Sequence, residues 1–381
     1  MKYCLIFVQI LSAAFSDLTA QKTWYVNATA VGSNSGANWA NAFLDPQSAL
    51  LLAAYGDRIW VAAGTYLPTP DADRSRSFDL PPGVQLLGGF AGTEAVEQER
   101  DVQANPTVLS GDIGASGVQA DNSYHVVRVH GGDSLTVLDG FIIRYGQTEL
   151  AGAPFPGQYG GGLLVVADKA RPLARPLIRN CQFEYNRAYA GGGIAGVSRD
   201  NAVCIPEVYD CRFSRNRGEL YGGGFYKADR NLAGEAYVLR NCLFEDNYCF
   251  QYSGGVALIN PSGEVQIIGC TFLRDSSRVE SGGLYLETSD YNTKYLLDSC
   301  YFAYNYSLIH AAAVSQICIC EGMDTLYFEV SNCIFEFNKT NGNAPSFSSF
   351  ILSSGVFHQV HVTRSSFTNN YSWGPGGGID E

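Results

Sequence analysis

The sequence predicts an all-β fold, a right-handed parallel β-helix in which each coil stacks on the one before it. Two recurring patterns predict it: the phrase Cys-x-Phe-x-x-Asn, and openings of two or three glycines between the phrases. Their spacing is the third observation. The distance between successive cysteines of the phrase is nearly constant, shortest from Cys242 to Cys270 and longest from Cys300 to Cys333. A period of about 30 residues indicates one supersecondary unit stacked on copies of itself.

Each repeat contains short apolar runs, such as Ile194–Val197 and Val265–Ile268, separated by Gly, Asn, Asp and Ser. None of them extends the helical spacing of apolar residues over ten or more positions, so the unit is several strands joined by turns. The glycine openings argue against helical repeats of similar period. Stacked at about 4.8 Å per coil, each strand pairs with its equivalents above and below. The openings are Gly160–Gly162, Gly191–Gly193 and Gly222–Gly224, with weaker ones at Gly254–Gly255, Gly282–Gly283 and Ala311–Ala313.

Stacking places equivalent positions of the repeats in columns. We predict an inward cysteine column and, because strands alternate with period two, an inward phenylalanine column. We expect the asparagines at a turn, where Asn tolerates the left-handed backbone and its amide bonds to the Asn above and below. The glycine openings mark corners without room for a Cβ atom. The predicted columns are Cys181, Cys211, Cys242, Cys270, Cys300 and Cys333; Phe183, Phe213, Phe244, Phe272, Phe302 and Phe335; and Asn186, Asn216, Asn247, Asn305, Asn338 and Asn370, with Asp275 in one Asn position and Ser365/Phe367 in a degenerate last copy.

Two resemblances support the fold. The alternation of Gly-Gly-x-Ile/Leu/Val with Phe-x-x-Asn over residues 160–381 resembles the repeats of the polymorphic outer-membrane proteins, right-handed parallel β-helices of bacterial surfaces. We expect that family's membrane-embedded C-terminal barrel to be absent here. The run from Gly56-Asp57-Arg58-Ile59 to Tyr66 resembles the start of the first coil in pectin-lyase-like proteins, and the chain as a whole is similar to secreted β-helix proteins of this type from Bacteroidetes.

We divide the chain into three segments. Residues 1–20 resemble a signal peptide, with Lys2, an apolar run and Leu18-Thr19-Ala20 before the cleavage site. Residues 21–56 are expected to cap the first coil with a helix over Asp45–Tyr55, because Asp45 suits the N-cap and Pro46 the first turn. Residues 57–381 form the β-helix, with irregular coils over 57–159 and regular coils over 160–381. The last six residues look like the opening of a further coil, so we expect an incomplete C-terminal end that a continuation or a capping partner covers.

Charge and composition exclude some partners. The net charge of −12 argues against nucleic acid and against an anionic membrane surface. A membrane-spanning helix needs an apolar stretch of about 18 residues or more, and none follows residue 20. We therefore expect no direct membrane span in the mature chain. The expected location is extracellular or on the bacterial cell surface, associated with the outer membrane.

The six column cysteines are expected to be free, whereas the state of the other cysteines stays open. Without Cys4 ten remain, an even number that permits disulfides in an exported protein. In a column, however, the Cβ atoms lie about 4.8 Å apart, farther than the about 3.8 Å that a disulfide prefers. The column therefore consists of buried thiols. Cys318 and Cys320 point to one face of a strand, but no partners of zinc-site spacing accompany them, so no metal site is predicted.

No catalytic constellation emerges from the columns. Hydrolysis of a glycoside needs two carboxylates, and a lyase needs a base, often with Ca²⁺. Glu184, Glu245 and Glu336 share an offset that other residues interrupt, whereas Asp139 with Arg144 and Lys227 with Asp229 are interpreted as isolated surface ion pairs. We predict no catalytic, cofactor-binding or metal-binding residue. The residues that directly precede the column cysteines, and the equivalent residue before Ser365, include a single carboxylate, Asp210. The series is Asn180, Asp210, Asn241, Gly269, Ser299, Asn332 and Arg364.

The predicted function is that of a secreted or cell-surface β-helix scaffold, non-catalytic, which acts in adhesion and binds a polysaccharide or a cell-surface protein. The 23 tyrosines are interpreted mainly as packing between coils. The alternative is a polysaccharide lyase or glycoside hydrolase. It stays open because loops over 68–82, 91–106 and 147–159 can bring groups together in ways that sequence offsets do not reveal.

Overall fold

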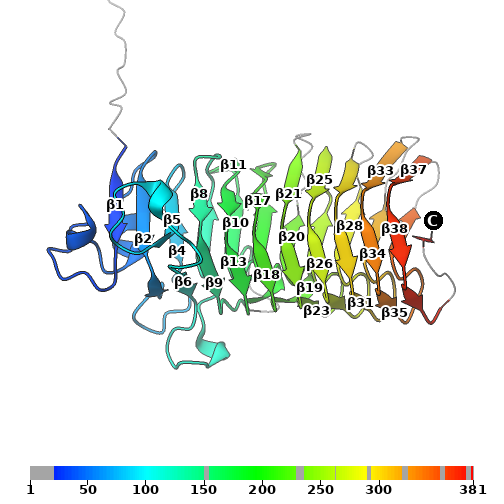
Figure 1. Cartoon of the computed structure of the whole chain (residues 1–381), viewed down its shortest axis with the longest axis horizontal. Coiled ribbons are helices and arrows are strands. Elements are labelled where there is room, and N and C mark those ends of the chain that lie inside the picture. The colour runs from blue at the N-terminus through cyan, green and yellow to red at the C-terminus, as the bar shows by residue number, and fades with distance from the viewer. Residues whose placement is uncertain are drawn as a thin grey trace, which may run out of the picture.

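The computed structural model describes residues 21–149, 154–228, 236–261, 263–289, 293–319, 325–351, 357–374 and 379–380. The predicted signal peptide lies outside these residues. The strands stack along one axis as a solenoid, with the irregular coils at the N-terminal end (Figure 1). Each regular coil contributes one strand to each of four long sheets, which we call sheets A to D.

The strand order within every long sheet follows the sequence, one coil after the next. Sheet A consists of β1 (Thr23–Val26), β2 (Arg58–Ala62), β5 (Gln85–Phe90), β8 (Val137–Asp139), β12 (Leu177–Arg179), β17 (Glu207–Tyr209), β21 (Tyr237–Arg240), β25 (Glu264–Ile268), β29 (Lys294–Asp298), β33 (Thr325–Ser331) and β37 (Phe357–Thr363). Sheet B consists of β3 (Gly64–Tyr66), β6 (Thr107–Ser110), β9 (Phe141–Arg144), β13 (Gln182–Glu184), β18 (Arg212–Ser214), β22 (Leu243–Glu245), β26 (Thr271–Leu273), β30 (Tyr301–Ala303), β34 (Ile334–Glu336) and β38 (Ser366–Thr368).

The other two long sheets form the opposite side of each coil. Sheet C consists of β4 (Phe78–Leu80), β7 (Val127–His130), β10 (Leu163–Ala167), β15 (Ile194–Ser198), β20 (Phe225–Ala228), β24 (Val256–Ile259), β28 (Leu284–Thr288), β32 (Val314–Cys318), β36 (Phe347–Ile351) and β40 (Ile379–Asp380). Sheet D consists of β14 (Arg187–Ala190), β19 (Arg217–Tyr221), β23 (Tyr248–Cys249), β27 (Ser276–Ser277), β31 (Tyr306–Ser307), β35 (Lys339–Thr340) and β39 (Tyr371–Ser372). A short pair, β11 (Leu173–Ala174) and β16 (Val203–Cys204), joins two neighbouring loops.

Neighbouring coils pair in parallel and in register, so that Phe183 lies over Phe213 and Phe213 over Phe244. The all-β parallel β-helix predicted from the repeats is therefore confirmed. All six predicted phenylalanines are fully buried. Their rings form one continuous stack with centroid separations of 4.5–5.1 Å and interplanar angles of 1–10°, which Phe367 extends.

The asparagine column forms the expected ladder. Asn186 Nδ2 donates to Asn216 Oδ1 at 3.1 Å, and the bond repeats from coil to coil. The predicted left-handed backbone of these asparagines is wrong. The residue before each one is left-handed instead, including Tyr185 at φ 56° and Phe337 at φ 54°. That residue turns the corner, which leaves the asparagine side chain pointing into the coil, where its amide replaces backbone bonds lost at the bend.

The six column cysteines are buried and free, as are Cys204 and Cys249. Their thiols lie near backbone carbonyls; Cys211 Sγ, for example, is 3.2 Å from the carbonyl oxygen of Tyr209. Burial raises the pKa of Cys211 and of Cys270 well above the ordinary thiol value. Cys318 differs from them because it is disulfide-bonded. Cys320, its predicted companion on the strand, lies outside the described residues.

The predicted helix is present but shorter than Asp45–Tyr55. Helix α1 spans Pro46–Leu50, and the Asp45 side chain accepts a 3.0 Å hydrogen bond from the Ser48 backbone as the predicted N-cap. Ala49 and Leu50 are buried with β1, β2 and β4. Leu51 and Leu52, which follow the helix, are 85% and 57% exposed, so the buried face is not continued directly after Leu50. The role of residues 21–56 as a cap stays a prediction.

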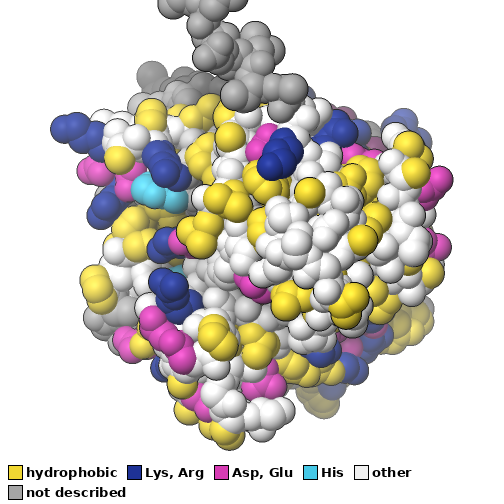
Figure 2. Space-filling model, turned by 90° about the vertical axis from the view of Figure 1, so that its left-hand side faces the viewer, with side chains coloured by type: hydrophobic (Ala, Val, Ile, Leu, Met, Phe, Trp, Pro, Cys, Tyr) yellow, Lys and Arg dark blue, Asp and Glu magenta, His cyan; other side chains and the backbone are white. Residues whose placement is uncertain are grey.

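Loops leave the coils mainly near the N-terminal end (Figure 1). They carry three short 3₁₀ helices, η1 (Trp39–Asn41), η2 (Glu97–Glu99) and η3 (Gln119–Asp121). Viewed from that end, basic and acidic side chains are interspersed with hydrophobic ones (Figure 2). Within the described ranges, no helix is long and apolar enough to cross a membrane.

Candidate functional site

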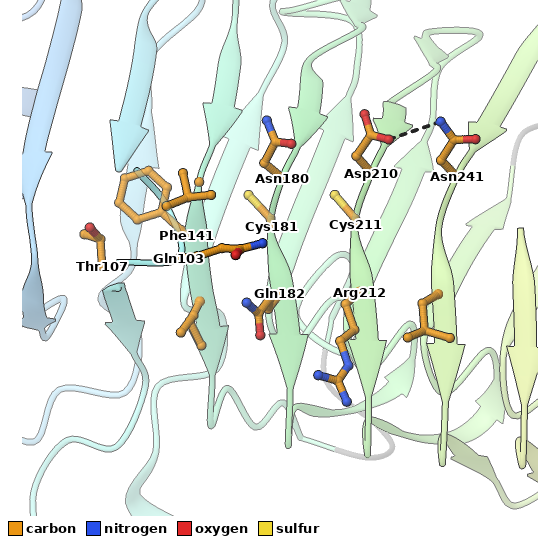
Figure 3. Close-up of a pocket in the computed structure, with 14 residues that line it drawn as sticks. Gln103, Thr107, Phe141, Asn180, Cys181, Gln182, Asp210, Cys211, Arg212 and Asn241 are labelled. Carbon is orange, nitrogen blue, oxygen red and sulfur yellow. Dashed lines mark hydrogen bonds between the residues drawn. The ribbon is translucent and has the colours of Figure 1, made fainter. Parts of the chain in front are cut away.

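The row of residues that precedes the column cysteines lines a shallow pocket of about 330 Å³, which we call the amide trough. Asn180, Asp210 and Asn241 stand in a row across three neighbouring coils (Figure 3). All three have a left-handed backbone, with φ of 52–54°, which projects their side chains outward at the corner between sheets A and B. Gln103, from the loop after η2, reaches over one end of the trough.

The trough is polar but carries little charge of its own. Asn241 Nδ2 donates to Asp210 Oδ1 at 3.1 Å, and Asn180 Nδ2 donates to Asp139 Oδ1 at 2.9 Å. Its cation, Arg212, is bound to Glu245 at 2.6 Å. Since Asp210 is the one carboxylate among the lining residues, the trough lacks the paired carboxylates that glycoside hydrolysis needs.

A second candidate lies at the corner between sheets D and C, on the outside of the solenoid. Alternate residues of the strands of sheet C, such as Leu164 and Val166 of β10, belong to a hydrophobic cluster separate from the interior core. That cluster contains a series of tyrosines, which we call the tyrosine seam. Its members come from the residues just before the glycine openings and from the outer face of β20 and β28. They are Tyr159, Tyr221, Tyr252, Tyr226 and Tyr285.

The rings of the seam pack against each other along the solenoid axis. The centroid of Tyr226 is 5.8 Å from that of Tyr159 and 5.4 Å from that of Tyr221, with nearly parallel planes. Tyr252 lies 4.5 Å from Tyr221 and 4.9 Å from Tyr285. Packing between coils, the interpretation made from sequence, describes these contacts, because Tyr226 and Tyr285 are buried and the other three rings are partly buried against the same cluster.

The N-terminal end of the seam opens into a pocket of about 440 Å³, which we call the aromatic pocket. Val197 and Ala228 form its floor, and Phe155 and Tyr159 line it beside Tyr226. The polar rim comes from the loop after β15, where the Arg199 guanidinium lies 5.3 Å from the Phe155 ring centre. Arg199 is also paired with Asp168 at 3.7 Å and with Asp200 at 3.6 Å. The remaining lining residues are Ser198, Asp200, Asn201 and Ala202.

Carboxylates follow the tyrosines at the other end of the seam. Glu280 occupies the position after Tyr252 in its column; Glu280 Oε2 accepts a 3.0 Å hydrogen bond from Ser315 Oγ. Burial raises the pKa of Glu280. Glu287 Oε2 accepts a 2.7 Å hydrogen bond from the Tyr285 hydroxyl. Burial, and then these carboxylates, raise the pKa of Tyr285 and of Tyr252.

Two of the predicted surface ion pairs need comment. The pairing of Asp139 with Arg144 is wrong: Asp139 is fully buried and binds Arg100 at 2.5 Å and Arg179 at 2.7 Å. Arg144 instead lies 3.5 Å from Glu184, one coil away. The side chain of Lys227 lies inside the solenoid, 4% exposed, with its ammonium 5.1 Å from the Tyr237 ring centre. Asp229 lies outside the described residues.

The sequence contains a signal for part of the seam, namely tyrosines close before the glycine openings. Tyr159 and Tyr221 directly precede glycine openings, and only Ser253 separates Tyr252 from the opening at Gly254–Gly255. By contrast, Tyr285 shares its column with Tyr226 only across an intervening Ala257, and the equivalents of Glu287 in the neighbouring coils are Ile259 and Ile317, so the repeat does not mark these positions.

No protein-family model and no curated protein sequence matches the chain. Among solved structures, pectate lyase Pel9A aligns over 91% of this chain and 78% of its own, with 12% identity and a TM-score of 0.42. The Streptococcus pneumoniae surface protein and adhesin PfbA aligns over 88% of this chain and 93% of its own, with 9% identity and a TM-score of 0.24. Overlaps this loose carry no activity over to the present chain.

Proposed function

We propose that this chain is an exported β-helix scaffold that binds a glycan at the aromatic pocket without cleaving it. The observation that carries the proposal is the composition of that pocket. Aromatic side chains of Phe155, Tyr159 and Tyr226 stand over an apolar floor, while Arg199 and Asn201 supply polar groups at the rim. A sugar ring presents apolar C–H faces and hydroxyl groups together, so a site for it needs both kinds of wall.

Size and position also support a glycan. A pocket of about 440 Å³ is within the range of small-ligand sites and accommodates one or two sugar rings. The seam continues from the pocket along the solenoid axis, and a glycan chain that leaves the pocket in this direction passes one coil about every 4.8 Å. Tyr159, Tyr221 and Tyr252 of the seam are only partly buried, and a tyrosine hydroxyl both donates and accepts hydrogen bonds.

Retention on immobilised glycans tests the proposal. We expect the chain to be retained on at least one polysaccharide of a neutral, acidic and amino-sugar panel, and we expect Phe155→Ala and Tyr159→Ala to weaken this binding about tenfold or more. The matched control is Tyr185→Ala, which removes a tyrosine that packs against Tyr145 at a different corner. A panel without retention, or equal loss in the control, would contradict the proposal.

Cleavage of a polysaccharide is the second candidate, and one observation favours it. Glu280 and Glu287 are two carboxylates on the outside of the same corner, and burial raises the pKa of Glu280, as suits a general acid. The same panel decides between the two candidates when released reducing ends and unsaturated products are measured. Product release that Glu280→Gln abolishes would establish an enzyme, whereas retention without turnover supports the binding scaffold.

A further inference from the structure

Glu287 lies at a defined distance from the aromatic pocket. Parallel pairing places Ala228, on the pocket floor, beside Ile259 and places Ile259 beside Glu287. Glu287 is thus two coils along the same outer column, about 10 Å from the floor at the usual strand spacing. A ligand of a few sugar units that starts in the pocket and follows the seam reaches this carboxylate.

The carboxylates of the seam lack the arginine partners found elsewhere on the solenoid. On sheet B, Glu245 is bound by Arg212 at 2.6 Å and by Arg274 at 2.5 Å. Among the described residues, no Arg or Lys is ion-paired with Glu280 or Glu287; the nearest imidazole, that of His310, is 3.7 Å from Glu280. At the pocket rim, Arg199 is already paired with two aspartates. Among the described residues, the carboxylates of the seam therefore have no ion pair with an Arg or Lys.

A second observation concerns the column that continues from Tyr285. Ser315 follows Tyr285 in the outer column of sheet C, and Ser348 follows Ser315. Ser315 Oγ binds Glu280, but Ser348 is 1% exposed and its hydroxyl has no hydrogen-bond partner among the described residues. Buried polar groups normally have partners, and this unsatisfied hydroxyl lies one coil beyond Ser315, on the side away from the aromatic pocket.

We infer that the glycan bound by this protein carries a protonated amino group, and that Glu287 binds this ammonium while a neighbouring ring occupies the aromatic pocket. The inference rests on the proposed function. An ammonium group supplies a positive charge and further hydrogen-bond donors for Glu287, which accepts a hydrogen bond from the neutral Tyr285 hydroxyl. A polyuronate would instead bring carboxylates against Glu280 and Glu287, and this repulsion disfavours it.

Two oligosaccharides that differ only in the amino group test the inference. One is a hexamer of β-1,4-linked glucosamine and the other is its fully N-acetylated form. We expect the first to bind the full chain about tenfold more tightly, because a charge-assisted hydrogen bond is lost on acetylation. Glu287→Gln should reduce this preference to about twofold. Added salt should weaken the preference in the unmodified chain.

Glu336→Gln is the matched control. Glu336 accepts a hydrogen bond from the Tyr301 hydroxyl, as Glu287 does from Tyr285, but it lies on sheet B, away from the seam. Tyr285→Phe is a second test variant that keeps the charge and removes the bond orienting Glu287; it should lower the preference in part. Equal binding of both hexamers, or tighter binding of a polyuronate, would overturn the inference and leave glycan binding intact. A chain that binds no glycan overturns both.

Discussion

Asn247 Nδ2 donates a 2.9 Å hydrogen bond to Asp275 Oδ1, at the coil where the asparagine ladder contains a carboxyl group. Asp275 is fully buried, and its Oδ2 has no hydrogen-bond partner among the described residues. In the neighbouring coils the equivalent atom is an amide nitrogen that donates to a phenylalanine carbonyl, as Asn305 Nδ2 does to Phe272 at 2.9 Å. Burial raises the pKa of Asp275 well above its ordinary value, which favours the protonated form in the folded state.

Asp275→Asn is expected to stabilise the protein by about 1–2 kcal/mol near neutral pH, because it restores the missing donor. The gain should depend on pH. The folded state holds this proton to a higher pH than the unfolded chain, so the stability of the unmodified protein falls as pH rises from about 4 toward the raised pKa. Urea unfolding at several pH values measures the gain, with Asp210→Asn at the exposed corner as control. A gain that is constant with pH would contradict this account.

The thiols provide a count that checks the cysteine column. Eight cysteines of the described residues are free and Cys318 is bonded. For the chain from residue 21 onward, we expect eight reactive thiols after denaturation without reductant and two more after reduction. In the native state the column should react slowly, because burial raises the pKa of thiols such as Cys211 and Cys270. Two or fewer thiols in the denatured chain would mean that the column is oxidised.

The phenylalanine stack should respond differently at its centre and at its end. Phe244 is fully buried between Phe213 and Phe272, so Phe244→Ala should cost about 3–5 kcal/mol of unfolding free energy. Phe367 is partly buried and contacts the stack through Phe335 alone, so Phe367→Ala should cost about 1–2 kcal/mol. Denaturant unfolding measures both values. Equal costs at the two positions would argue against a continuous stack.

A methyl group at the glycine corner, as in Gly192→Ala, should destabilise the fold. A Cβ atom on Gly192 would lie 2.5 Å from the Gly223 carbonyl oxygen and 2.6 Å from that of Arg217, and both belong to the backbone of the next coil. Gly192→Ala should therefore destabilise the fold by about 2 kcal/mol or more. Further along the same column the equivalent position is Ala312, which is fully buried, and Ala312→Gly should cost about 1–2 kcal/mol through backbone entropy and the loss of a buried methyl group. Thermal unfolding of the two variants compares them, and a neutral Gly192→Ala would show that the corner has room.

The columns could be predicted from the sequence because stacking repeats them at a nearly constant spacing along the chain. The conformation at the asparagine turn could not, since the left-handed residue varies in type, from Tyr185 to Arg215 to Asp246, and its neighbours above and below impose the bend. The ion-pair partners of Asp139 could not be predicted from the sequence either. Arg100 belongs to an irregular loop after η2, and Arg179 belongs to the next coil, so no fixed offset connects them.

The two candidate sites also differ in how far the sequence predicts them. The amide trough follows from the residue before each column cysteine, a position that the sequence makes visible as Asn180, Asp210 and Asn241. The tyrosine seam depends on which residues face outward at the corner of sheets D and C. Tyr226 and Glu287 face there because of the local strand register, and sequence periodicity does not mark them.

In-register stacking also fixes the distance between sites on different coils. The aromatic pocket and Glu287 are fixed to coils whose separation is a whole number of strand spacings, each about 4.8 Å. Removal or insertion of one complete coil between them would change their separation by one such step and leave the pocket and the carboxylate themselves unaltered. The ligand length needed to reach both sites therefore changes in steps of one strand spacing. The number of coils between the two sites determines this length, and side-chain substitutions do not change it.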